Sequence, residues 1–355
     1  MRVLQAMAGA EFGGAEAFFV RLVIALHKAG LNQRVIIRHH PARAKAFREA
    51  GIEPVELAFG GWTDFRTSSA LKREIRAFRP DVALTWMNRA TRMLPKGEFA
   101  HVGRLGGYYN LKYYRKCSHL IANTEDIREY LISDGWPAVR AHYLPNFVTE
   151  TKAEPVDRRP FFTPDDAPLV VAMGRLHENK AFDVLLEAMA RIPGAYLWIA
   201  GEGPDRAELE KKAEVLGVKP RTRFLGWRED TPALLASGDI FVCPSRHEPL
   251  GNVVLEAWAQ AAPVIAADSY GPGTLIENRE TGILVPVDDA PFMATAITNL
   301  LKDDKLRQRI ARQGHQAFKK SYTGKIVVER FMEFFKSVAP EVESKPTAEA
   351  KGKLP

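Results

Sequence analysis

Several classes of protein are excluded by what this 355-residue sequence lacks. Its two cysteines, Cys117 and Cys243, lie far apart and without metal-ligand spacing, so neither a disulfide framework nor a zinc site is expected. No apolar run approaches the roughly 20 residues of a membrane-spanning helix. Residues 1–4 begin as a strand and not as a signal peptide. We therefore expect a globular, cytoplasmic protein.

The motifs of several common enzyme classes are absent as well. The sequence has no Asp-x-Asp pair of the kind that lets a divalent cation bridge a diphosphate, so we expect no metal ion. It also lacks G-x-G-x-x-G, G-x-x-x-x-G-K-[ST] and G-x-S-x-G. These absences argue against dinucleotide binding, a nucleoside-triphosphatase phosphate loop and an α/β-hydrolase nucleophile.

Positive charge is unevenly distributed along the chain. Residues 1–150 hold 22 Lys and Arg against 14 Asp and Glu, a net charge of +8, and residues 151–355 hold 28 against 29, or −1. The first half is therefore suited to an anionic lipid headgroup, a nucleic acid or a phosphorylated acceptor. The alternative is a solvated basic surface without a partner.

Apolar stretches of strand length alternate twice with helical stretches, a pattern typical of βαβ units and parallel sheets. The first series is 2–8, 15–29, 33–38, 42–50, 53–58, 68–78 and 81–86. The second series is 169–173, 182–191, 196–200, 205–216, 222–225, 239–243, 253–260, 263–267 and 282–285. We therefore expect α/β domains at 1–150 and 169–320, a proline-rich linker at 151–168, a helix at 321–338 and a disordered tail at 339–355.

The segment between the apolar strand at 239–243 and the helix that begins near 252 carries the most chemistry. It holds two glutamates eight positions apart, Glu248 and Glu256. The first turn of the helix has free backbone N–H groups that suit an anion. A nucleotide sugar offers phosphates to the backbone and hydroxyls to the carboxylates. Because ligands bind beyond the carboxyl ends of parallel strands, we place the site between the two domains.

Other short segments admit two interpretations each. Arg175 and Lys180 follow a strand and can both reach a diphosphate, or Arg175 caps carbonyls while Lys180 is solvated. Gly13 and Gly14 would let backbone amides approach a phosphate closely. Gly201 and Gly203 either face a ligand or only form a turn. The Tyr- and Lys-rich segment 108–116 suits a membrane interface or a saccharide, but we favour a helix with its tyrosines packed inward.

Taken together, these motifs resemble glycosyltransferase family 4, whose members are retaining enzymes of the GT-B architecture. The similarity is strong over about 169–290 and weaker before it, and it is carried by 13–16, 145–146, 174–180, 201–204, 224–226, 244–256, 263–266 and 280–286. The resemblance implies two Rossmann-like domains with parallel sheets facing across a cleft. It also implies a C-terminal helix that crosses back to the first domain.

The resemblance further implies which residues handle the donor. Arg175 and Lys180 would bind the diphosphate, and Glu248 would contact the sugar hydroxyls. The other donor-binding positions are Gly14, Gly174, Gly203, Trp227, Gly251, Asn252, Val253 and Glu256. The co-substrate would be a nucleoside-diphosphate sugar, with uridine preferred over guanosine, and there would be no cofactor and no nucleic-acid partner.

One departure from the family separates this chain from many members, which carry a histidine in the first domain. The corresponding segment here is 102–108, and glycine stands at Gly106 and Gly107. Our leading hypothesis is a metal-independent hexosyltransferase of lipopolysaccharide or surface-polysaccharide synthesis, acting on a saccharide or glycolipid acceptor. It would lie on the inner face of the cytoplasmic membrane, held there by its basic first domain. The alternatives are a nucleotide-sugar-binding protein without transferase activity and a sugar-nucleotide epimerase of the same architecture.

Overall fold

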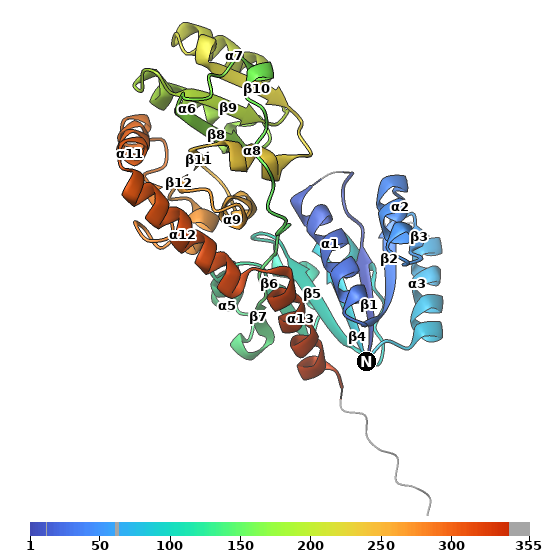
Figure 1. Cartoon of the computed structure of the whole chain (residues 1–355). Helices are drawn as coiled ribbons and strands as arrows, with labels where there is room; N and C mark the ends of the chain where they lie inside the picture. Colours follow the sequence, from blue (N-terminus) through green and yellow to red (C-terminus); the bar gives the residue numbers. More distant parts are fainter. Residues whose placement is uncertain (12, 61–63, 341–355) are drawn as a thin grey trace, which may run out of the picture.

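The computed structural model describes residues 1–11, 13–60 and 64–340. It forms two α/β domains, each built on a parallel sheet (Figure 1). The tail expected at 339–355 lies, from residue 341 onward, outside the described residues.

The first domain is built on a seven-stranded sheet in the order β3-β2-β1-β4-β5-β6-β7. Its strands are β1 (Arg2–Met7), β2 (Asn32–Arg38), β3 (Val55–Leu57), β4 (Val82–Trp86), β5 (Ala100–Leu105), β6 (His119–Ala122) and β7 (Ala141–Tyr143). Its helices are α1 (Gly14–Lys28), α2 (Pro41–Glu49), α3 (Phe65–Phe78), α4 (Met87–Met93) and α5 (Glu125–Ser133). The strands β5, β6 and β7 follow the last strand that the sequence analysis lists.

The second domain is built on a six-stranded sheet in the order β10-β9-β8-β11-β12-β13. Its strands are β8 (Leu169–Met173), β9 (Tyr196–Ala200), β10 (Thr222–Gly226), β11 (Ile240–Cys243), β12 (Val264–Ala267) and β13 (Ile283–Val285). Its helices are α6 (Phe182–Ala190), α7 (Arg206–Val215), α8 (Thr231–Ser237), α9 (Asn252–Ala259), α10 (Tyr270–Leu275) and α11 (Ala290–Lys302).

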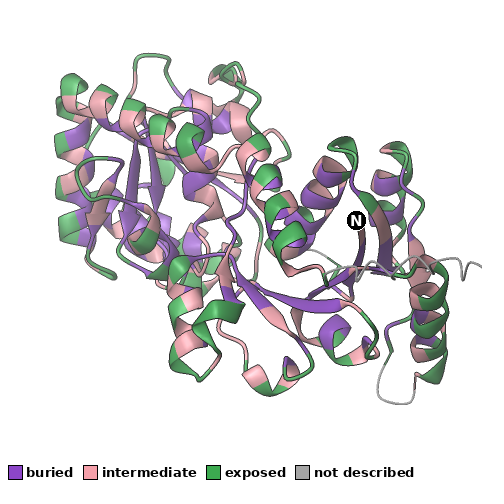
Figure 2. Cartoon of the chain, turned by 90° about the horizontal axis from the view of Figure 1, so that it is seen from below, coloured by how far each residue is buried: buried purple, intermediate pink, exposed green. Residues whose placement is uncertain are grey.

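Hydrophobic patterning explains the layers of both domains. The central strands β4 and β8 are buried along their whole length, as expected for parallel strands covered by helices on both faces. Figure 2 shows this burial along the strands and the inner faces of the helices, with exposed residues on the outside. Several helices begin at a side-chain cap, for example Asp64 before α3 and Thr124 before α5.

The chain returns to the first domain at its end. Helix α12 (Asp304–Ser321) packs on α9, and α13 (Gly324–Val338) then lies on the first domain, so that the two run along one side of the molecule (Figure 1). Val327, Phe331 and Phe335 of α13 are fully buried in the core formed by β1, β4 and α1. The crossing helix that the resemblance implies is therefore present.

The segment 108–116 does not form the helix that we favoured. It holds a single 3-10 turn, Leu111–Tyr113, and only Tyr114 among its tyrosines is fully buried. A Cβ added to Gly103 would lie 2.7 Å from the Tyr114 ring, so the glycine in β5 leaves room for this ring. The segment is a packed connection between β5 and β6, which are parallel neighbours, so its chain has to return along a face of the sheet to the start of β6.

Both sheets reverse their strand order next to a central strand. In the first the order reverses between β1 and β4, and in the second between β8 and β11. Connections leave these two strand pairs in opposite directions, which opens a crevice at their carboxyl ends. The loops after β1, β8 and β11 carry the motifs that the sequence analysis singled out, so the fold brings these motifs to the two crevices.

Candidate functional site

The loop after β11 is fixed in place by ion pairs on its outer side. The Arg246 guanidinium donates to both carboxylate oxygens of Asp183, over 2.9 and 2.7 Å, and its Nε lies 2.6 Å from Asp288. These carboxylates raise the pKa of Arg246. Arg246 is thus occupied in holding the loop, and the next charged side chain of the loop, Glu248, faces the cleft region.

Glu248 and Lys180 form an ion pair that joins the loops after β8 and β11. The Lys180 ammonium donates to Oε2 of Glu248, and both side chains are largely buried. The Lys180 side chain passes over Gly174, at which an added Cβ would lie 3.6 Å from the Lys180 stem. Two of the predicted site residues, 68 positions apart, are therefore in direct contact.

The N-terminus of α9 lies beside this pair. Gly251 precedes the helix with φ +66°, a left-handed conformation that glycine adopts without steric cost. The Gly251 N–H lies 3.4 Å from Oε1 of Glu248. Asn252 and Val253 begin the helix and are half-buried. Their N–H groups are among the donors that a helix leaves without intrahelical partners, so this end of α9 favours negative charge.

Glu256 lies one turn further along α9 and faces the first domain. The surrounding atoms desolvate this carboxyl group and raise its pKa to about 7, and the nearby charge of Glu248 acts in the same direction. Arg21 of α1 opposes the shift by its positive charge. Burial in turn lowers the pKa of Arg21, whose Nε is buried without a hydrogen-bond partner. Glu256 and Arg21 are thus polar groups facing each other between the domains.

The opposite wall is the loop between β1 and α1. A Cβ added to Gly14 would lie 3.8 Å from Nδ2 of Asn252, so Gly14 stands directly across from the start of α9. Glu16 is buried below it, and its Oε1 accepts a hydrogen bond of 2.8 Å from the Ala10 N–H. The buried carboxylate therefore shapes the loop and does not line the cleft.

A hydrogen-bonded relay joins the two walls. Asn146 donates from Nδ2 to Oδ1 of Asn252 over 2.9 Å and accepts a 2.7 Å hydrogen bond from Arg104. The Arg104 guanidinium is buried against the rings of Phe18 and Trp86, at 4.8 and 4.7 Å from their centroids. Desolvation lowers the pKa of Arg104 to about 9. This relay orients Asn252 from the first domain.

The glycines at 201 and 203 allow two loops of the second domain to touch. A Cβ at Gly201 would lie 1.9 Å from the Gly174 carbonyl oxygen, and one at Gly203 would lie 2.1 Å from that of Leu176. Gly203 therefore supports the loop after β8 from below. Of the remaining predicted residues, Arg175 is exposed and Trp227 has 72% of its surface exposed.

Arg175 makes no hydrogen bond or ion pair with any residue that the structure describes.

Sequence reasoning missed two residues of this arrangement. Arg21 and Arg104 come from the first domain, and their role depends on contacts with residues more than 40 positions away. One sequence feature points to Arg104: it is a lone cation at the end of an apolar strand, and such a residue needs a partner when it is buried. Nothing in the local sequence around Arg21 distinguishes it from a solvated helix arginine.

Two family models together span most of the chain. The model described as Glycosyltransferase Family 4 matches residues 12–152, and the model described as Glycosyl transferases group 1 matches residues 154–317.

The chain belongs to glycosyltransferase family 4.

Two relatives support this membership over almost their whole length. The lipopolysaccharide core biosynthesis glycosyltransferase LpsE of Rhizobium meliloti (strain 1021) is 38% identical over 336 residues, which cover 92% of this chain and 96% of LpsE. LpsD of the same organism is 35% identical over 340 residues, covering 94% of this chain and 98% of LpsD. This glycosyltransferase is therefore an enzyme, and neither the epimerase nor the pure binding protein is favoured.

Solved structures share the two-domain fold. HepE of Anabaena in complex with UDP superposes with a TM-score of 0.84 at 19% identity, covering 95% of this chain and all of HepE. The lipopolysaccharide glycosyltransferase WaaG superposes with a TM-score of 0.69 at 16% identity, covering 95% of this chain and 99% of WaaG. The expected GT-B architecture is thus confirmed.

Two further observations bear on the environment of the site. In the described part of the chain, no three His, Cys, Asp or Glu side chains gather in a way that would hold a metal ion. None of the described helices combines the length and the apolar character needed to span a bilayer.

Proposed function

We propose that this glycosyltransferase moves a sugar from a nucleoside-diphosphate sugar, with uridine preferred, to a saccharide or lipid-linked acceptor of the lipopolysaccharide core. LpsE and LpsD are both lipopolysaccharide core biosynthesis glycosyltransferases and match nearly the whole chain, which supports the pathway. The UDP and UDP-glucose complexes of HepE support the donor class. We also propose that transfer retains the anomeric configuration and needs no metal ion.

The observation that carries the proposal is the contact between Lys180 and Glu248 beside the start of α9. A diphosphate placed there would take Lys180 as its counter-charge and accept hydrogen bonds from the N–H groups of Gly251, Asn252 and Val253. Arg175, exposed and without a partner among the described residues, would swing onto the same diphosphate. These groups would stabilise the negative charge that grows on the leaving group.

Glu248 would be released by this exchange to bind the donor sugar. In the ligand-free structure its carboxylate is held by Lys180 and lies near the Gly251 N–H. Once Lys180 turns to the diphosphate, the carboxylate oxygens can accept hydrogen bonds from sugar hydroxyls. We propose departure and attack on one face of the sugar, with Glu248 as a hydrogen-bond acceptor and with the leaving phosphate helping to deprotonate the acceptor.

Glu256 would bind the ribose hydroxyls. It lies one turn beyond the diphosphate position on the same face of α9, and its half-buried carboxyl group faces the first domain. Gly14 on the opposite wall lets the first domain approach the start of α9, since even an added Cβ would lie 3.8 Å from Nδ2 of Asn252. Gly174, Gly203 and Trp227 would complete the donor site from the strand ends of the second domain.

The test is transfer by Lys180→Ala and Glu248→Ala, measured as UDP release from a panel of nucleotide sugars with purified lipopolysaccharide core as acceptor. We expect each variant to lose roughly a hundredfold to a thousandfold in kcat, Lys180→Ala because the leaving diphosphate loses its counter-charge and Glu248→Ala because the donor sugar is no longer held in position. Lys211→Ala, which removes an exposed lysine from α7, is the matched control and should keep full activity. Wild-type rates in both variants, or rates that vanish with a chelator, would contradict the proposal.

A further inference from the structure

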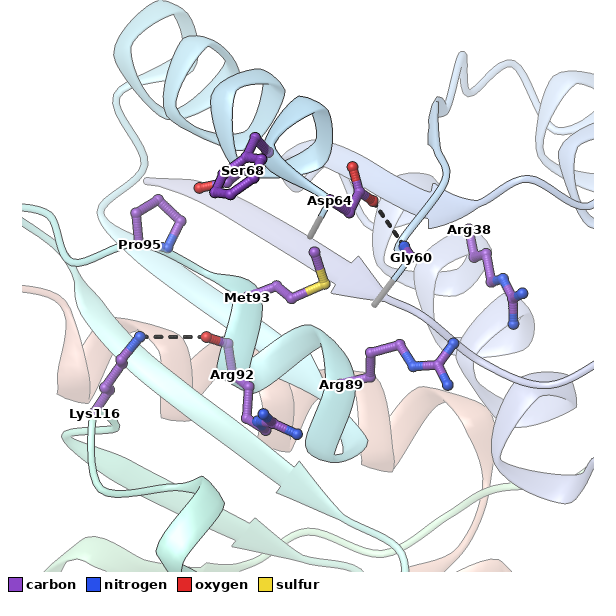
Figure 3. A pocket seen from close by; sticks show the side chains of 10 residues that line it. Arg38, Gly60, Asp64, Ser68, Arg89, Arg92, Met93, Pro95 and Lys116 are labelled. Atoms are coloured by element: carbon purple, nitrogen blue, oxygen red, sulfur yellow. Dashed lines mark hydrogen bonds between the residues drawn. The ribbon is translucent and has the colours of Figure 1, made fainter. Parts of the chain in front are cut away.

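The first domain holds a cavity of about 770 Å³ at the carboxyl end of its sheet. It lies between α3 and α4, and four of its lining residues are cations: Arg38, Arg89, Arg92 and Lys116 (Figure 3). The roles proposed for the donor site use none of these residues. Such a gathering of like charges is unfavourable in the absence of a counter-charge.

Among the residues that the structure describes, the four cations have no carboxylate partner, whereas several other cations of this domain have one. Arg34 pairs with Glu74 at 3.4 Å, and Arg48 pairs with both Glu53 and Glu56. Within 1–11, 13–60 and 64–340, by contrast, the cations that line the cavity form no ion pair with a carboxylate. Four cations of the first domain without a carboxylate partner among the described residues therefore line one cavity.

Neighbouring groups position these cations without neutralising them. Arg92 stacks over the Tyr113 ring, with its guanidinium carbon 5.3 Å from the ring centroid, and Lys116 donates to the Arg92 carbonyl over 3.3 Å. Arg89 donates to the Phe59 carbonyl over 3.4 Å, and in Figure 3 its side chain extends toward Arg38. Carbonyl oxygens and a ring face leave the charge of each group in place.

Asp64, the acidic residue among those that line the cavity, already accepts hydrogen bonds from neighbouring groups. Asp64 caps α3 and accepts hydrogen bonds from the Gly60 N–H, the Thr67 N–H and the Thr67 hydroxyl, over 2.7, 2.9 and 2.6 Å. These bonds lower its pKa, which keeps it ionised. One carboxylate thus stands against four cations, and both of its oxygens already accept hydrogen bonds from Gly60 or Thr67.

The cavity continues toward the donor site. A second cavity of about 490 Å³ shares Arg38, Arg89 and Arg92 with the first and reaches Gly9 and Tyr109. The strands β2, β1 and β4 are neighbours in the sheet, so both cavities lie above the carboxyl ends of adjacent strands. The loop after β1 leads on to Gly14, which faces Asn252.

We propose that Arg38, Arg89 and Arg92 bind an anionic group, a phosphate or a carboxylate, on the saccharide acceptor. The proposal rests on the proposed function, since it names the chemical class of the acceptor. Guanidinium groups recognise both anions through paired hydrogen bonds, and three of them on two neighbouring elements match an anion that is attached to a larger ligand. The continuity of the two cavities would leave the neutral part of the acceptor near the donor sugar.

The test uses the full chain with its donor site filled by saturating UDP. Inorganic phosphate, glucuronate and vesicles of phosphatidylglycerol in phosphatidylcholine are titrated separately, with calorimetry and thermal shift as readouts. We expect phosphate or glucuronate to bind, and Arg38→Ala/Arg89→Ala to weaken that binding tenfold to a hundredfold. Arg89→Gln alone should weaken it less. Arg76→Ala, which removes an exposed arginine of α3 outside the cavity, should bind as the wild type does.

The outcomes separate the sources of the anion. Binding of phosphate identifies a phosphorylated acceptor, and binding of glucuronate alone identifies a carboxylated one. Binding of the vesicles alone, or equal binding in the double variant, would overturn the proposal. If UDP does not bind the wild type, the proposed function fails on that result. The comparison of Arg38→Ala/Arg89→Ala with Arg76→Ala in the phosphate titration still decides the role of the cavity.

Discussion

The cations on the two walls of the cleft differ in whether they are paired with carboxylates. In the second domain Lys180 is paired with Glu248, and Arg246 is paired with Asp183 and Asp288. In the first domain Arg38 and Arg89 line a cavity with no carboxylate partner among the described residues. Apart from Arg175, which has no partner among the described residues, the cations of the donor wall are held in advance by internal pairs, whereas we expect the basic wall to gain its counter-charge from a ligand.

The largest effect should follow from disturbing the prebuilt wall at Gly201. An added Cβ would lie 1.9 Å from the Gly174 carbonyl, and the residue has φ +148°. We expect Gly201→Ala to lower the free energy of unfolding by about 3 kcal/mol or more, since it combines overpacking with backbone strain. Chemical denaturation measures this change, and UDP binding should be lost with it.

Gly217→Ala is the matched control for this prediction. Gly217 has φ +67° and nothing within 4 Å of an added Cβ, so it reports the cost of the backbone conformation alone, about 1 kcal/mol. Equal destabilisation in the two variants would show that the contact between the loops after β8 and β9 does not hold the donor wall.

A smaller effect, on activity and not on stability, is expected at the relay between the walls. Arg104→Met removes a buried cation and its hydrogen bond to Asn146, while keeping an apolar stem of similar length among Phe18 and Trp86. Replacing a buried charge by an apolar side chain leaves stability within about 1–2 kcal/mol. Transfer should fall roughly tenfold, because Asn146 no longer orients Asn252. An unchanged kcat/KM would show that the hydrogen bond from Arg104 to Asn146 does not help to orient Asn252 for transfer.

The smallest effect is the pH dependence of stability caused by Glu256. Its pKa is about 7 in the folded chain and about 4.5 when unfolded, so the folded state binds more protons between these values. The contribution of Glu256 to the free energy of unfolding is therefore fully present below pH 4.5, decreases as the pH rises to 7 and levels off above it. We expect the free energy of unfolding to fall by about 1–2 kcal/mol over this range, a value reduced for solvent screening because the carboxyl group is partly exposed.

Thermal melts of the wild type and of Glu256→Gln between pH 5 and pH 8 measure this contribution. The variant carries a permanently neutral side chain, so the part of the slope that Glu256 causes should disappear in it. A slope that is the same in both proteins would show that the carboxyl group is ionised in the folded state throughout this range.

Features that depend on short stretches of the chain could be predicted from the sequence. Strand β8 has the predicted bounds, and the motifs after β1, β8 and β11 could be assigned to strand ends because short apolar runs and glycines mark these boundaries. The contact between Lys180 and Glu248 was not predicted; it arises because β8 and β11 are parallel neighbours, whose carboxyl ends lie side by side.

Packing between residues far apart in the chain could not be predicted from the sequence. The tyrosine segment was wrongly expected to be helical, because its course depends on the space that Gly103 leaves for Tyr114. The relay from Arg104 to Asn252 crosses between domains that no local pattern relates. The net charge of the first half was visible in the composition, but the gathering of four of its cations at one cavity depends on the fold.

The central claim is that the diphosphate of the donor is bound by Lys180 and the start of α9. Calorimetric titration of UDP into the wild type and Lys180→Ala, with and without EDTA, tests it most directly. We expect the variant to bind UDP at least tenfold more weakly than the wild type, and EDTA to change the affinity of neither protein. Equal affinity in the two proteins, or binding that disappears with EDTA, would contradict it.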